Sequence, residues 1–262
     1  MCNNNNITVT LLGTGTSGGV PSLGCQCEVC RSKDPRDHRL RCVALVESAA
    51  GTRVLIDCGP DIRQQLMPLP FKPFDAILMT HIHYDHVGGI DDLRPFSVFG
   101  PINLYGDEKT CDHVRQIMPY CFGEHLYPGV PHLELHTIRP HEPLRIGDLE
   151  IIPIEVMHGK MPILGFRIGK FAYITDMKTI GDTELLYLDG VETLVVNALR
   201  FEKEHHSHQL VADAAEFAHK IGAKQTYITH VCHHIGLYDE AEKRMPEGLS
   251  LAYDGLKLTM ER

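Results

Sequence analysis

Four residues that can bind metal ions crowd into six positions of this chain, and they constrain its fold more than any other feature. The short apolar run 76–80, which predicts a strand, leads directly into them: His81, His83, Asp85 and His86. A strand end is a rigid platform, and imidazole and carboxylate groups suit Zn²⁺, Mn²⁺ or Fe²⁺. Because such a crowd of titratable groups is costly to leave unpaired, the segment predicts a metal site.

Potential ligands also follow predicted strands further along the chain. The strands expected at 151–156, 171–175 and 227–229 are followed by His158, Asp176 and His230. Taken alone, each of these residues is more often a capping or core residue than a ligand. A sheet delivers the residues at its strand ends to one edge, so together with the first cluster they favour a single shared metal site.

The rest of the chain alternates predicted strands and helices without a linker or a low-complexity stretch. Further strands are expected at 7–12, 42–48, 53–57, 102–105, 133–138, 149–156, 163–168, 193–197 and 225–229, and helices at 60–67, 108–118 and 208–221. The segments 249–252 and 256–260 predict a closing hairpin. This pattern favours one α/β domain over residues 1–262, and two sheets packed face to face with outer helices would fit it.

Three of the nine cysteines fall within six residues: Cys25, Cys27 and Cys30. The polar segment 1–6 has no secretion signal, so a disulfide framework is not expected. Three thiols can wrap one Zn²⁺, but a closed tetrahedral site needs a fourth ligand. The candidates are distant in sequence: Cys42, Cys58, Cys232, His233 and His234. Reduced surface thiols and a redox role are the alternatives.

The formal net charge of −9 at pH 7 makes a broad nucleic-acid-binding surface unexpected. One basic segment stands out, with Arg31, Lys33, Arg36, Arg39 and Arg41. It is interpreted as a solvated loop paired with nearby carboxylates, and holding an anionic substrate is the alternative. No apolar run approaches the roughly 20 residues that span a bilayer, so no membrane association and a cytoplasmic location are expected.

The motif His81-x-His83-x-Asp85-His86, followed in order by His158, Asp176 and His230, resembles that of the metallo-β-lactamase superfamily. The resemblance covers essentially the whole chain. It implies an αββα sandwich of two mixed β-sheets flanked by helices, with two divalent metal ions, Mn²⁺ or Zn²⁺, at one edge. It further implies that one ion is held by His81, His83 and His158 and the other by Asp85, His86 and His230. Asp176 would bridge the two ions, and Asp57 would support a ligand histidine.

A narrower resemblance rests on Gly13-Thr14-Gly15, Gly19-Val20-Pro21, the cysteine cluster and His208. These features are similar to the branch of the phosphonate-pathway cyclic phosphoribosyl phosphodiesterase, which is related to the tRNA 3′-processing endonucleases. The branch implies a structural Zn²⁺ on Cys25, Cys27, Cys30 and His233, with His234 as the alternative fourth ligand. It also implies a catalytic role for His208 beside Asp85 and Asp176. His205 and His206 are expected to line the substrate pocket, and a homodimer is expected by analogy.

These observations predict a dinuclear metal-dependent hydrolase that acts on a small phosphodiester, cyclic nucleotide-like or ribosyl cyclic. The same fold also hosts thioester and lactone hydrolases and RNA-processing nucleases, and a non-catalytic metal- or nucleic-acid-binding module is a further alternative. No long inserted arm of the kind that grips tRNA is visible, which disfavours a nuclease. The segment 96–136 matches no motif and is expected to contain loops that contact substrate.

Overall fold

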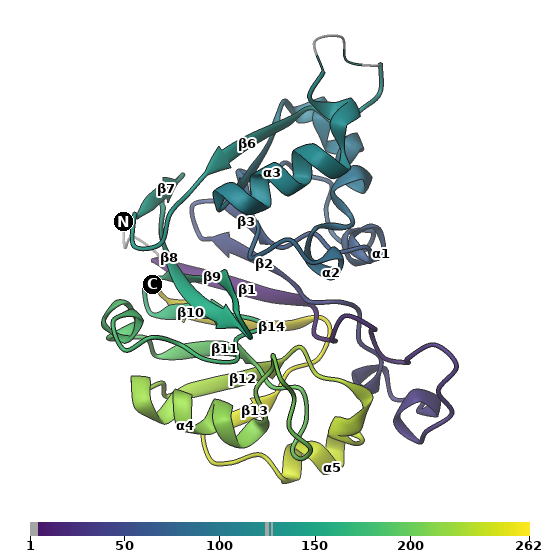
Figure 1. Ribbon diagram of the computed structural model, residues 1–262, viewed down its shortest axis with the longest axis vertical. Coiled ribbons are helices and arrows are strands. Elements are labelled where there is room, and N and C mark those ends of the chain that lie inside the picture. Colours follow the sequence, from purple (N-terminus) through teal and green to yellow (C-terminus); the bar gives the residue numbers. More distant parts are fainter. Residues whose placement is uncertain (1–4, 124–125, 127) are drawn as a thin grey trace.

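The computed structural model describes residues 5–123, 126 and 128–262, and its centre is a pair of seven-stranded sheets packed face to face (Figure 1). The first sheet has the strand order β14-β1-β2-β3-β4-β5-β6. Its strands are β1 (Asn6–Gly13), β2 (Val43–Ser48), β3 (Arg53–Ile56), β4 (Ala76–Leu78), β5 (Ile102–Gly106), β6 (Leu133–Thr137) and β14 (Leu256–Glu261). Strands β3 to β6 are parallel to one another, and β14, β1, β2 and β3 pair antiparallel.

The second sheet has the order β13-β12-β11-β10-β9-β8-β7. Its strands are β7 (Leu144–Ile146), β8 (Leu149–His158), β9 (Met161–Ile168), β10 (Phe171–Ile174), β11 (Thr193–Asn197), β12 (Gln225–Thr229) and β13 (Leu249–Leu251). Strands β7 to β10 form an antiparallel meander, and β10 to β13 are parallel. Both sheets are therefore mixed, as the resemblance implied.

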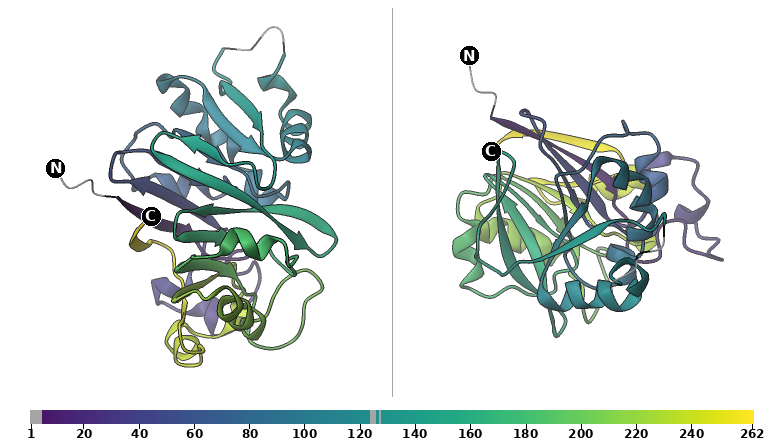
Figure 2. Two further views of the ribbon diagram at one scale, coloured as in Figure 1. Left: turned by 90° about the vertical axis from the view of Figure 1, so that its left-hand side faces the viewer. Right: turned by 90° about the horizontal axis from the view of Figure 1, so that it is seen from above.

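Helices cover the outer face of each sheet, and the views of Figures 1 and 2 place the teal and green helices on opposite sides of the strands. The first sheet carries α1 (Ile62–Leu66), α2 (Tyr84–Val87) and α3 (Glu108–Ile117), and the second carries α4 (Val211–Ile221) and α5 (Tyr238–Lys243). Short 3₁₀ segments also connect these elements: η1 (Val29–Arg31), η2 (Pro35–Asp37), η3 (Ile90–Phe99), η4 (Pro119–Cys121), η5 (Glu184–Leu188) and η6 (His233–Ile235). The predicted αββα sandwich is confirmed. Within the described residues, no helix is long and apolar enough to cross a membrane.

The hydrophobic core has three layers because most strands are buried on both faces. Alternate residues of β1, such as Val9 and Leu11, pack between the sheets against Phe166 and Tyr173. A second layer lies between the first sheet and its helices, and a third lies between the second sheet and α4. Burying each large apolar side chain contributes about 1.5–3 kcal/mol, so the sheets form a rigid base for residues at their edge.

One predicted element is wrong, and a second begins later than predicted. The segments 249–252 and 256–260 do not form a hairpin, because β13 pairs with β12 while β14 pairs with β1 of the other sheet. Asp254 ties down this crossover by accepting hydrogen bonds from Thr14 Oγ1 and Leu40 N, each at 2.7 Å. The helix expected from His208 begins only at Val211, because Leu210 is extended.

The basic segment is only partly the solvated loop that the sequence suggested. Arg36 pairs with Asp34 at 2.6 Å and with Asp239 at 3.0 Å, as an exposed loop residue would. Arg39 instead is buried, and its guanidinium donates to Thr14 Oγ1 at 2.8 Å and to the carbonyl oxygen of Ala252. It therefore holds the N-terminal loop against the crossover. The polar segment 1–4 lies outside the described residues.

Candidate metal centre

The candidate metal ligands stand at strand ends or in the turns that follow them. β4 leads into the turn that carries His81 and His83, and His83 is the residue that precedes α2. β8 ends at His158, Asp176 comes two residues after β10, and His230 directly follows β12. Strands that run in the same direction deliver their carboxyl ends to one edge, which is why residues so far apart in sequence meet here.

The backbone turns sharply at two of these positions and at Asp57, which directly follows β3. Asp57, Asp176 and His230 have positive φ angles of 65°, 58° and 54°. The left-handed region is uncommon for residues other than glycine and costs about 1–3 kcal/mol. Such strain persists where the surrounding structure enforces it, and it is typical of functional sites.

All seven residues predicted as ligands are brought together. Ligand atoms within 4.8 Å of one another form two triplets, His81 with His83 and His158, and Asp85 with His86 and His230. A third group joins His81 and His86 to Asp176. Asp176 Oδ1 lies 3.1 Å from His230 Nε2, and its Oδ2 lies 3.2 Å from His86 Nε2. Because Asp176 also groups with His81 and with His158, its carboxylate lies between the two triplets.

The histidine nitrogens of the site suit divalent metal ions. The Nδ1 atoms of His86 and His158 are hydrogen-bonded, to Asp57 at 2.7 Å and to the Asp176 carbonyl oxygen at 2.8 Å. The Nε2 atoms of His81 and His86 are buried and have no hydrogen-bond partner among the described residues. A buried polar atom without a partner costs about 1–3 kcal/mol, which a coordinated cation would remove. The donor set of imidazole and carboxylate therefore fits metals such as Zn²⁺.

Asp57 supports the candidate ligand His86 and is not itself a candidate ligand. It is completely buried, and it accepts hydrogen bonds from Thr80 N at 2.8 Å and from Thr80 Oγ1 at 2.9 Å. Burial raises the pKa of Asp57, whereas its contact with His86 opposes that rise. Burial alone would lower the pKa of His86, but Asp57 and Asp176 outweigh it and raise that pKa well above its ordinary value. Thr80 Oγ1 also forms a hydrogen bond of 2.9 Å with His81 Nδ1. The sequence did not predict this role for Thr80.

His208 lies against this cluster from the loop before α4. Its Nδ1 is 3.5 Å from Asp176 Oδ1, and its ring lies 4.8 Å from that of His158. Its ligand atom also falls within 4.8 Å of those of His158 and Asp176, so a metal ion and a substrate are both within its reach. Burial, with a smaller contribution from His230, lowers the pKa of His208 to about 3. The imidazole is therefore neutral at pH 7 in this structure.

The other two histidines of this loop lie progressively farther from the cluster. The ring of His205 is 4.9 Å from that of His208 and 4.4 Å from that of His206. His205 is half-buried and His206 is exposed. His205 therefore flanks the site directly, whereas His206 lies at its rim.

A second cluster joins the cysteines to His233. Ligand atoms of Cys25, Cys27, Cys30 and His233 all lie within 4.8 Å of one another. His233 Nδ1 is 3.4 Å from Cys25 Sγ and 3.2 Å from Cys27 Sγ, and its contact is the largest cause that lowers the pKa of Cys27 to about 6. The structure thus places His233, rather than the exposed His234, at the fourth position. All eight described cysteines are free thiols.

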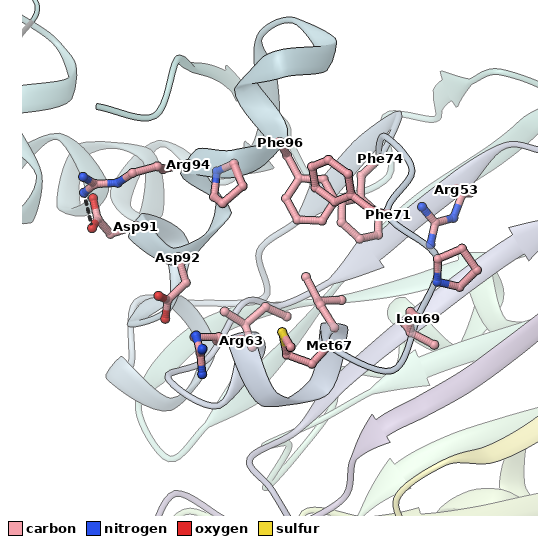
Figure 3. A pocket seen from close by; sticks show the side chains of 14 residues that line it. Arg53, Arg63, Met67, Leu69, Phe71, Phe74, Asp91, Asp92, Arg94 and Phe96 are labelled. Atoms are coloured by element: carbon pink, nitrogen blue, oxygen red, sulfur yellow. Dashed lines mark hydrogen bonds and ion pairs between the residues drawn. The ribbon is translucent and has the colours of Figure 1, made fainter. Parts of the chain in front are cut away.

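A hollow of about 590 Å³ on the outer side of the first sheet is separate from both clusters. It lies between α1 and η3, where Phe71, Phe74 and Phe96 face one another (Figure 3). The described residues that line it include none of the candidate ligands. It is therefore not part of the metal centre.

Comparison with known proteins assigns the chain to a family. Residues 52–231 match the model of the beta-lactamase superfamily domain. A solved structure described as a new diphosphatase from the PhnP family is 39% identical, with a TM-score of 0.89, and 97% of each chain is covered. Zn²⁺-bound PqqB from Methylobacterium extorquens is 20% identical, with a TM-score of 0.76 over 96% of this chain and 99% of that chain, and shares the fold.

Curated relatives are mostly longer than this chain. A Porphyromonas gingivalis protein named octanoyltransferase is 41% identical over 96% of this chain but only 51% of its own length. A ribonuclease Z from Bradyrhizobium diazoefficiens is 26% identical over 87% of this chain and 90% of its own length. The chain spans about half the length of the first curated relatives it matches.

The fold, the ligand cluster and the matched model together show that the chain belongs to the β-lactamase superfamily and has the metallo-β-lactamase fold. Within that superfamily it belongs to the PhnP-like branch, which the likeness to the diphosphatase over nearly the whole chain establishes.

Proposed function

We propose that the protein is a dinuclear metal-dependent phosphodiesterase that acts on a small phosphodiester. The observation that carries the proposal is the position of Asp176, whose carboxylate lies within 4.8 Å of ligand atoms of both triplets, those of His81 and His158 in one and that of His86 in the other. The diphosphatase relative supports a phosphate ester or anhydride as the substrate class. The −9 net charge favours a small substrate over a nucleic acid.

In this proposal His81, His83 and His158 would hold one ion, Asp85, His86 and His230 would hold the other, and Asp176 would contribute to both sites. Bound divalent ions supply Lewis acidity toward the phosphoryl oxygens and water. The chain keeps the ligands in place: Asp57 fixes the ring of His86, and the Asp176 carbonyl oxygen fixes that of His158. Native active-site ions are Mn²⁺ or Zn²⁺, and the cysteine cluster holds a third, structural Zn²⁺.

His208 is proposed to stabilise the charge that develops on the phosphoryl group and to protonate the leaving oxygen. Burial is the main cause that lowers the pKa of His208. A phosphate anion beside the ring favours the protonated form, since an adjacent opposite charge raises the pKa of a histidine. Substrate binding would thus supply the proton donor that the reaction requires. His205 and His206 would complete the wall of the pocket on this side.

The experiment that tests the proposal compares two substrates on one preparation. We expect metal analysis to give about three metals per chain, as the two proposed sites require. With added Mn²⁺, the protein should hydrolyse bis(p-nitrophenyl) phosphate much faster than the thioester S-lactoylglutathione. A faster thioester reaction would assign the site to the thioesterase alternative. Absence of both reactions in fully metallated protein would favour a binding module.

Replacing His208 with alanine should separate chemistry from metal binding. We expect the metal content to stay unchanged while kcat for bis(p-nitrophenyl) phosphate falls about 10²- to 10⁴-fold, the range for loss of a proton-transfer group. Metal analysis and steady-state kinetics on the same sample measure both effects. Loss of one active-site metal would instead make His208 a ligand beside His158 and Asp176, and unchanged turnover would remove it from the mechanism.

A further inference from the structure

A hollow of about 660 Å³ lies beside the candidate metal centre. It is formed between α2 and the segment from α3 to η4, and its lining is mostly apolar or aromatic: Ile82, Tyr84, Val87, Ile117, Met118 and Tyr120. His83, a candidate metal ligand, also lines it. His83 therefore places one side of the hollow next to the candidate metal centre.

Tyr84 is held at a fixed place between the metal centre and this hollow. It is the single residue between His83 and Asp85, and its side chain is 70% exposed. The ring lies over Gly88, where an added Cβ would come within 2.6 Å of a ring carbon. The close packing on glycine fixes the inner side of the ring and leaves its other side open to a ligand.

The opposite wall offers a second aromatic ring. Tyr120 is 45% exposed, and its hydroxyl donates a hydrogen bond of 2.9 Å to Asp91, which is in turn paired with Arg94. Ile117, 43% exposed, lies on the same wall. Large apolar groups gathered at the mouth of a polar site mark a surface for ligand contact, because water solvates them poorly.

We propose that this hollow binds the nucleobase of a nucleotide-containing substrate, with Tyr84 as the residue on which the base stacks. The placement of the phosphate rests on the proposed function. Two tyrosine rings favour a flat π-system over a flexible aliphatic chain, since aromatic rings prefer stacked or edge-to-face partners. Stacking accepts any of the bases, so the hollow selects nucleotides as a class over sugar phosphates.

The test compares adenosine 5′-monophosphate with ribose 5-phosphate, which differ only by the base. Titration calorimetry on the metal-loaded protein should show that the wild type binds the nucleotide at least about 10-fold more tightly, as one base stack provides. Tyr84→Ala should lose most of this preference without changing the affinity for ribose 5-phosphate. Tyr84→Phe should keep it, because the ring remains. Equal affinities in the wild type, or an unchanged preference in Tyr84→Ala, would overturn the proposal.

Leu186→Ala is the matched control, since Leu186 is 76% exposed on η5, in the second half of the chain, and should leave both affinities unchanged. Metal content and melting temperature of each variant verify that the centre is intact. The binding assay is also independent of turnover. A Tyr84-dependent preference without phosphodiester hydrolysis would contradict the proposed function alone, whereas hydrolysis without that preference would contradict the nucleobase site alone.

Discussion

Replacing Asp176 with asparagine is expected to lower kcat/KM for bis(p-nitrophenyl) phosphate by on the order of 10³-fold or more. The amide keeps the shape of the side chain but has no charge, and one of its two terminal atoms can no longer accept or coordinate. In the structure both carboxylate oxygens are in use, toward His86 and His230. Steady-state kinetics and metal analysis should show a fall from about three bound ions toward one, the ion of the cysteine cluster.

Asp182→Asn is the matched control for this substitution. Asp182 carries the same functional group, but its side chain is 91% exposed and pairs with Lys220 at the surface. An exposed ion pair is worth at most about 1 kcal/mol, so this variant should behave as the wild type. If Asp176→Asn kept more than a tenth of the activity with all its metals bound, a bridging carboxylate would be the wrong description of the site.

The ligand cluster could be predicted because each member has a signal in the neighbouring sequence, either the motif at 81–86 or the end of an apolar run. His158, Asp176 and His230 each stand at or just after the end of an apolar strand, and strands that run in the same direction within a sheet end at one edge. The contacts that orient the ligands are not marked in this way. Thr80 reads as an ordinary residue between a strand and a histidine, and its bonds to Asp57 appear only when β3 and β4 pair.

Pairing between distant strands explains what the sequence could not show. The alternation in 249–252 and 256–260 fits a hairpin as well as it fits two strands of different sheets. The deciding interactions come from elsewhere, since β13 adds to the parallel edge of β12 and Asp254 binds Thr14 and Leu40. Local periodicity carries no information on such partners.

The hollow beside His83 could not be predicted from the sequence either. Tyr84 stands inside the motif at 81–86, and that motif indicates metal ligands but no neighbouring hollow. Its partners Ile117 and Tyr120 lie in the segment 96–136, which matched no motif and was expected to hold substrate-contacting loops. That expectation stays a prediction; residues 124, 125 and 127 of the segment lie outside the described part of the chain.

The second large expected effect is on stability, and it follows from the placement of His233, rather than His234, in the cysteine cluster. His233→Ala should release the ion of the cysteine cluster and lower the melting temperature by roughly 6–12 °C, which corresponds to a loss of about 3 kcal/mol. The cluster joins the loop around η1 to η6, where a small apolar group with Val20, Val29 and Leu237 and the ion pair between Arg36 and Asp239 also connect the two parts. Loss of the ion therefore removes one of the main links between these segments. Calorimetry and metal analysis measure both effects.

His234→Ala is the control, because His234 is the adjacent histidine, is exposed and lies outside the cluster. It should keep all the metal and melt as the wild type does. Well below its melting temperature, His233→Ala should retain the active-site metals and most of its turnover. The cysteine cluster shares no residue with the candidate metal centre that contains Asp176. If both variants lost the ion equally, the cysteines alone would not select His233, and if neither did, the cluster would be three thiols without a structural zinc.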